Sequence, residues 1–80
     1  MSKIKKEIGN ILNNQSGVDF ETIDRILKYF GYIPFSNGSH YTYRKKENGK
    51  ITIPKHKPIG TVYIKAVIKL LDLKVWYDKN

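Results

Sequence analysis

The chain has 80 residues and no cysteine, and 15 Lys and Arg against 7 Asp and Glu give a formal net charge of +8. A chain of this length forms one small domain that buries only about 60–65% of its unfolded surface, so a large buried cofactor is not expected, and disulfides and thiolate metal sites are excluded. No apolar run approaches the roughly 20 residues of a membrane span, which predicts a soluble, cytoplasmic protein without membrane contact.

Two helices are predicted in the first third of the chain. The first covers residues 2–14, and its apolar residues form one narrow stripe that should dock on another element. That stripe consists of Ile4, Ile8, Ile11 and Leu12. The second helix is predicted over 19–30, with Asp19 as N-cap and Gly31 as the glycine that follows its C-terminus.

Three strands are predicted next. Residues 32–35 form an apolar strand, and Pro34 confines it to a sheet edge because proline has no N–H to donate to a ladder. Residues 36–38 (Ser-Asn-Gly) are predicted as a turn. Strands over 40–46 and 50–54 then form a hairpin.

Two pairings of this hairpin are possible. A two-residue turn at Asn48-Gly49 places Tyr43 opposite Pro54, whereas a three-residue loop with a left-handed Gly49 places Tyr43 opposite Ile53. Burial favours the second pairing, because only this one gathers the large apolar residues on one face. That face carries Tyr41, Tyr43, Ile51 and Ile53. The opposite, polar face carries His40, Thr42, Arg44, Lys46, Lys50 and Thr52.

The last third of the chain predicts a loop and then a helix over 62–71, with Thr61 as N-cap. This helix is apolar nearly all round, so we expect it to be the central core element, laid across the sheet. The tail, 73–80, either continues the helix or folds back. The order α-α-β-β-β-α predicts an α+β domain, in which helices cover one face of a three-stranded antiparallel sheet.

The strong positive charge points to a polyanionic partner, nucleic acid foremost, although it also suits solubility or an acidic protein partner. RNA carries its own nucleophile, the 2′-hydroxyl, so its cleavage needs a base, an acid and positive charge, but no metal. His40 is the candidate base. Extending the hairpin past Pro54 brings His56, a candidate acid, across from it. Arg44, Lys55 and Lys57 are candidate ligands of the scissile phosphate.

Plainer interpretations stay open for each of these residues. His40 follows a turn and can simply hydrogen-bond the backbone, and His56 can be an exposed loop residue. Tyr41 and Tyr43 are expected in the core rather than stacked on bases. Gly38 suits the backbone geometry of the turn and also leaves room for a phosphate.

The segment from Phe20 to Leu73 resembles the HicA toxin family, the mRNA-cleaving half of a toxin–antitoxin pair. The matching segments are Leu27-Lys28-Tyr29-Phe30-Gly31-Tyr32, Gly38-Ser39-His40-Tyr41, Ile51-Thr52-Ile53-Pro54, His56 and Ile59-Gly60-Thr61-Val62. The ordered set is more specific than Gly-Ser-His alone. Residues 1–17 and 74–80 then flank the family core, as an N-terminal helical extension and a C-terminal tail of one HicA-like domain.

The resemblance implies a double-stranded-RNA-binding-like α-β-β-β-α fold. It implies that His40 is catalytic, that the protein is a metal-independent, cofactor-free endoribonuclease acting on mRNA, and that a HicB-like antitoxin occludes the site. The free toxin is expected to be a monomer that arrests growth under stress. The residues expected to bind RNA are Gly38, Ser39, Arg44, Lys46, Lys55, His56 and Lys57.

Two other functions remain compatible with the sequence. A non-catalytic RNA-binding module of the same fold would bind through the lysines of the hairpin and the following loop. A protein that has lost catalysis would bind only an acidic antitoxin. Only the enzyme yields RNA fragments, which distinguishes it from the non-catalytic RNA-binding module. Both of these are expected to bind RNA at physiological salt, whereas the protein that binds only an antitoxin is not.

Overall fold

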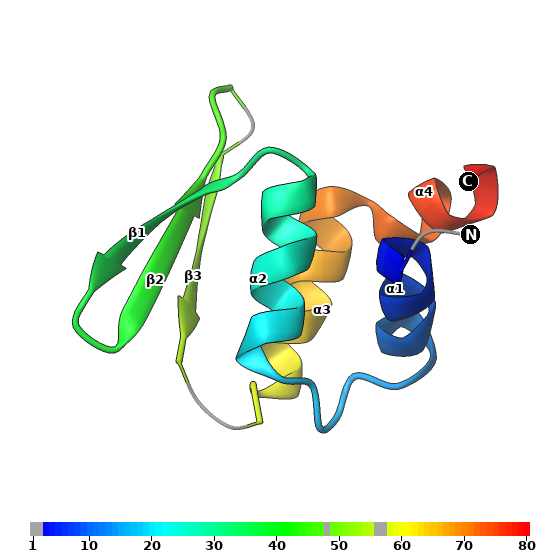
Figure 1. Ribbon diagram of the computed structural model, residues 1–80, viewed down its shortest axis with the longest axis horizontal. Coiled ribbons are helices and arrows are strands. Elements are labelled where there is room, and N and C mark those ends of the chain that lie inside the picture. The colour runs from blue at the N-terminus through cyan, green and yellow to red at the C-terminus, as the bar shows by residue number, and fades with distance from the viewer. Residues whose placement is uncertain (1–2, 48, 56–57) are drawn as a thin grey trace.

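The computed structural model describes residues 3–47, 49–55 and 58–80 (Figure 1). In chain order its elements are α1 (Lys3–Asn13), α2 (Phe20–Tyr29), β1 (Ile33–Asn37), β2 (His40–Arg44), β3 (Lys50–Pro54), α3 (Thr61–Leu71) and α4 (Leu73–Lys79). The strands form one antiparallel sheet in the order β1-β2-β3, so that β2 is central. Within the described residues, no helix combines the length and the apolarity that crossing a membrane requires.

The helices lie on one side of the sheet, with α2 and α3 nearest to the strands and α1 and α4 beyond them (Figure 1). The predicted α+β architecture is therefore confirmed as a double-stranded-RNA-binding-like fold, preceded by α1 and followed by α4. Among the described residues, no helix covers the other face of the sheet (Figure 1). We call it the open face, and the side that packs on the helices the covered face.

Helix α2 is the centre of the core, because Phe20, Ile23, Ile26 and Leu27 are all buried. Asp19 precedes it in an extended conformation, at the predicted N-cap position, although its side chain makes no cap hydrogen bond. The C-terminus is a Schellman motif, in which Gly31 adopts a φ of 91°. The Gly31 N–H donates to the Lys28 carbonyl and the Tyr32 N–H to the Leu27 carbonyl, both at 3.0 Å. Tyr32 is therefore part of the motif that ends the helix. The sequence had predicted it as the first residue of the strand, which instead begins at Ile33.

Helix α1 docks within the chain, as its apolar stripe predicts. Ile8 and Ile11 are buried on the side of α2 that faces away from the sheet. Arg25 of α2 donates to both carboxylate oxygens of Glu7. This hydrogen bond, more than the accompanying charge attraction, lowers the pKa of Glu7, against the opposing effect of partial burial. The N-terminal extension thus enlarges the core of the domain.

The turn between β1 and β2 differs from the predicted one. Asn37 pairs with His40, so Gly38 and Ser39 form a two-residue turn, and Ser36 belongs to the strand. Gly38 has a φ of 66°, the left-handed conformation that the first position of such a hairpin requires. This tight turn is compatible with the twist of the strands, whereas a turn at 36–38 would remove two residues from the ladder.

The second hairpin keeps the predicted faces but pairs two residues further along. Tyr43 lies opposite Ile51 and Tyr41 opposite Ile53, and the five residues 45–49 connect the strands. Each tyrosine thereby gains a β-branched partner on the covered face, whereas the predicted pairing would have set Tyr41 against a lysine. Gly49 is left-handed, as predicted, with a φ of 82°.

Helix α3 is less central than predicted. Ile64 and Val67 are buried, but Val62, in the first turn of the helix, is 73% exposed. Its N-cap is Gly60 rather than Thr61, since the Gly60 carbonyl accepts the Tyr63 and Ile64 N–H groups. The chain turns at Asp72, which has a φ of 51°, and α4 then packs against α1.

One polar contact joins the covered face to α2. Tyr43 is fully buried, and its hydroxyl donates to Asp24 Oδ1 at 2.6 Å. Lys28 Nζ lies 2.9 Å from the other carboxylate oxygen of Asp24. A tyrosine hydroxyl requires an acceptor once its ring is buried, and the Asp24 carboxylate supplies it.

Candidate functional site

His40 is the first residue of β2 and lies on the open face of the sheet. Its side chain is exposed, and its cross-strand neighbours are Asn37 in β1 and Pro54 in β3. Tyr41 and Tyr43, the residues of opposite parity, point to the covered face. The burial of these two rings therefore holds His40 toward solvent, at the centre of one end of the sheet.

The turn residues beside His40 are positioned by backbone contacts. Ser39 Oγ lies 3.5 Å from His40 Nδ1, and the Ser39 carbonyl accepts the Lys55 N–H at 2.8 Å. Gly38 is exposed, and a Cβ atom built on it would meet nothing within 4 Å. The turn that precedes His40 is therefore open to solvent at Gly38.

Lys55 is close to His40 in the backbone, but its side chain points elsewhere. Its ammonium lies 5.9 Å from the ring centroids of both Phe20 and Tyr41, which belong to the covered side of the sheet. The structure therefore does not place this charge on the open face beside the imidazole.

Arg44 lies on the open face at the other end of β2. Arg44 is four residue steps from His40 along the strand, which corresponds to about 13 Å. It pairs with Lys50, which is also exposed, and the hydroxyls of Thr42 and Thr52 lie 3.2 Å apart between the two ends. A polar path therefore runs along the open face from the histidine to two cations.

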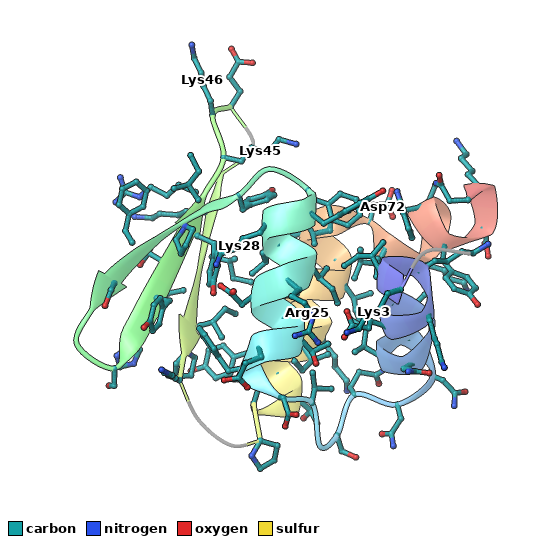
Figure 2. All side chains as sticks on the ribbon, in the orientation of Figure 1. Lys3, Arg25, Lys28, Lys45, Lys46 and Asp72 are labelled. Carbon is teal, nitrogen blue, oxygen red and sulfur yellow. The ribbon has the colours of Figure 1, made fainter. Side chains whose placement is uncertain are left out.

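Lys46 projects from the tip of the β2–β3 hairpin, at the end of the sheet away from the Gly38-Ser39 turn (Figure 2). Because β2 ends at Arg44, Lys46 lies outside the strand to which the sequence assigned it. Lys45 turns toward the covered side, with its ammonium 5.9 Å from the Tyr32 ring centroid. The lysines of this hairpin therefore diverge.

The predicted pairing of His40 with His56 is wrong, because Pro54 occupies the position opposite His40. In the observed pairing both tyrosines lie opposite isoleucines, and β3 is shifted by two residues relative to the predicted pairing. His56 and Lys57 themselves lie outside the described residues. Among the residues that the structure describes, no cluster of His, Asp and Glu side chains has the grouping of a metal site.

Phe35 is the residue of the site that sequence reasoning missed. It lies on the open face opposite Thr42, is 54% exposed, and has Arg44 Cζ 5.7 Å from its ring centroid. The dipeptide Gly38-Ser39 was the signal that could have found it. Placing the turn there extends β1 to Asn37 and assigns Phe35 to the same face as His40.

Comparison with protein families gave a match over most of the chain. The model of the family described as HicA toxin of bacterial toxin–antitoxin matches residues 20–73, from the start of α2 to the start of α4. Comparisons with curated proteins and with solved structures gave no significant match. The family match covers most of the chain, including the three described strands and the turn that precedes His40, so this protein belongs to the HicA toxin family.

Proposed function

We propose that this protein is a metal-independent endoribonuclease that cleaves mRNA with His40 as general base. Its family assigns it a toxin role in a toxin–antitoxin system and implies a HicB antitoxin as its partner. The observation that supports the enzymatic role is the placement of His40, exposed at the centre of the sheet end and beside an open glycine–serine turn.

The proposed reaction uses groups of the substrate and one side chain. His40 accepts the proton of a ribose 2′-hydroxyl, the 2′-oxygen attacks the adjacent phosphorus, and the bond to the 5′-oxygen breaks as that oxygen takes a proton from water. The protonated imidazole then returns its proton to the resulting hydroxide, which restores both His40 and the water. The products are a 2′,3′-cyclic phosphate and a free 5′-hydroxyl. The nucleophile comes from RNA, so a bound metal is not needed to generate it.

The remaining site residues are proposed to bind RNA. Gly38 and Ser39 admit the backbone at the scissile position, because the turn is open on that side. Arg44 is too far along β2 to reach the same phosphate and would hold a neighbouring one. Lys46 and Lys55 attract the chain from either end of the hairpin. His56 and Lys57 keep their proposed role in RNA binding.

The proposal is tested by incubating single-stranded RNA with the purified protein in EDTA. We expect fragments that end in 2′,3′-cyclic phosphate, detected by mass spectrometry. Intact RNA that is nevertheless bound would identify a non-catalytic RNA-binding module. Fragments that form only when divalent cations are restored would contradict the metal-independent mechanism.

Arg44 allows a test of the binding path that does not depend on cleavage. In Arg44→Ala, the plot of log K against log salt for a single-stranded oligonucleotide should become shallower by about 0.7, the loss of one phosphate contact. Lys79→Ala removes the same charge from an exposed position in α4, remote from the sheet (Figure 1), and should leave the slope unchanged. Equal slopes for the two variants would exclude a specific contact at Arg44.

A further inference from the structure

The open face of the sheet exposes apolar side chains as well as cations. Phe35 is 54% exposed and Ile33 60% exposed, both on β1 and both directed away from the helices. A domain this small depends for its stability on burying its large apolar side chains, and the exposed ring of Phe35 does not contribute to the core. The ring is therefore available for a contact outside the chain.

The strand pairing places this ring next to the candidate catalytic residue. Phe35 lies opposite Thr42, and Asn37 lies opposite His40, so Phe35 and His40 are diagonal neighbours on adjacent strands. Such neighbours are about 7–8 Å apart, within reach of an aromatic side chain. A nucleotide with its ribose at His40 can thus bring an adjacent base over the Phe35 ring.

Charge on the open face favours a nucleic acid over a protein segment. Arg44 Cζ lies 5.7 Å from the Phe35 ring centroid, and Lys50 is paired with Arg44 across the strands. The described residues of this face carry no carboxylate. The strand residues concerned are Ile33, Phe35, His40, Thr42, Arg44, Lys50 and Thr52. An aromatic ring flanked by cations on an otherwise neutral face combines stacking with attraction for phosphates.

We propose that the open face binds single-stranded RNA, with one base next to the cleavage site stacked on Phe35 and the following phosphate held by Arg44. This inference rests on the proposed ribonuclease function, and it names the form of RNA that the site accepts. In a duplex the bases are stacked on one another and their faces are not available to a protein ring. Single-stranded loops and unpaired regions of mRNA are therefore the substrates.

The test measures binding separately from cleavage. The probe is a fluorescent 2′-O-methyl oligonucleotide, which lacks the nucleophilic hydroxyl and cannot be cleaved, and its Kd is obtained by anisotropy. Phe35→Leu keeps an apolar side chain but removes the ring, and we expect a roughly 5- to 100-fold weaker Kd. Phe35→Trp should bind at least as tightly as the wild type.

Tyr29 supplies the matched control, because it is 57% exposed and lies at the end of α2, away from the open face. Tyr29→Leu should not change the Kd. The wild type should also bind the single strand more tightly than a duplex of the same sequence.

The proposal is overturned if Phe35→Leu binds the probe as tightly as the wild type, because the exposed ring would then make no contribution to RNA binding. It is equally overturned if the duplex binds as tightly as the single strand. Failure of the proposed ribonuclease function can be distinguished from failure of this inference. In that case the wild type would leave natural RNA intact, and the affinities of the Phe35 variants for the uncleavable probe would not bear on that result.

Discussion

His40→Ala is expected to reduce the rate of RNA cleavage by about 10²–10⁴-fold, the usual contribution of a positioned general base. The side chain is exposed, and its one hydrogen-bond contact among the described residues is the long one to Ser39, so its removal should not disturb the fold. The measurement is the single-turnover cleavage rate of a defined RNA in EDTA. The same variant should no longer inhibit growth when it is expressed without antitoxin.

Two controls give this result its meaning. The thermal midpoint of His40→Ala should match that of the wild type, and its affinity for the uncleavable oligonucleotide should change by no more than a few-fold. Loss of cleavage with retained binding identifies a catalytic role. A variant that cleaves at the wild-type rate would remove His40 from the mechanism, and the general base would then have to be sought elsewhere.

Tyr43→Ala is expected to have the largest effect on stability. The ring is fully buried between the sheet and α2, and truncation of a buried aromatic residue costs about 3–5 kcal/mol. An 80-residue domain has a total stability of roughly 4–12 kcal/mol, so this variant should be largely unfolded or close to unfolding at 37 °C. If the variant retains a folded baseline, urea denaturation followed by circular dichroism measures how far its free energy of unfolding lies below that of the wild type.

Tyr43→Phe isolates the hydroxyl and should remain folded. Loss of the hydrogen bond to the Asp24 carboxylate should cost about 1.5–3 kcal/mol, because hydrogen bonds to charged groups are among the stronger ones. Tyr41→Phe is the matched control on the same strand, since the Tyr41 hydroxyl makes no hydrogen bond to a described residue, and it should be close to neutral. Equal stability of Tyr43→Phe and the wild type would contradict the contribution assigned to this contact.

The same contact predicts a dependence of stability on alkaline pH. Burial, and then the hydrogen bond to Asp24, raise the pKa of Tyr43 above its ordinary value of 10.0. Below pH 10 both the folded and the unfolded states hold the proton, and the contribution is fully present. Above pH 10 the unfolded state loses the proton first, so the free energy of unfolding falls as pH rises. This decline should be steeper in the wild type than in Tyr43→Phe.

Local patterns were sufficient to predict α1, α2, α3 and the three strands, and to assign the two faces of β2 and β3. The apolar spacing of α2, with Gly31 in the motif that ends it, determines that helix because both features act within a few residues. The alternation of tyrosine and isoleucine in β2 and β3 determines which side of the sheet is covered, since a shift by one residue would expose all of them. His40 is assigned to the open face by this parity alone.

The helical packing could not be predicted in the same way. Val62 and Val67 are equally apolar, yet one is exposed and the other buried, because they lie on different sides of α3 and only the side of Val67 faces the core. Asp72 ends α3 in a left-handed conformation, which places α4 against α1. A non-glycine residue at such a position carries no clear signal in the sequence.

The composition and the short-range patterns of this chain establish a small basic α+β domain with a histidine on the polar side of a hairpin. The tertiary structure decides what surrounds that histidine. Alternation fixes the parity of a strand but not a shift of two residues, so the pairing of both tyrosines with isoleucines under α2 was needed to place Pro54, rather than His56, opposite His40. The tight turn at Gly38-Ser39 likewise places Phe35 on the open face. The pairing of β1 with β2 then sets Phe35 beside Arg44, and the local periodicity of the sequence does not predict this contact.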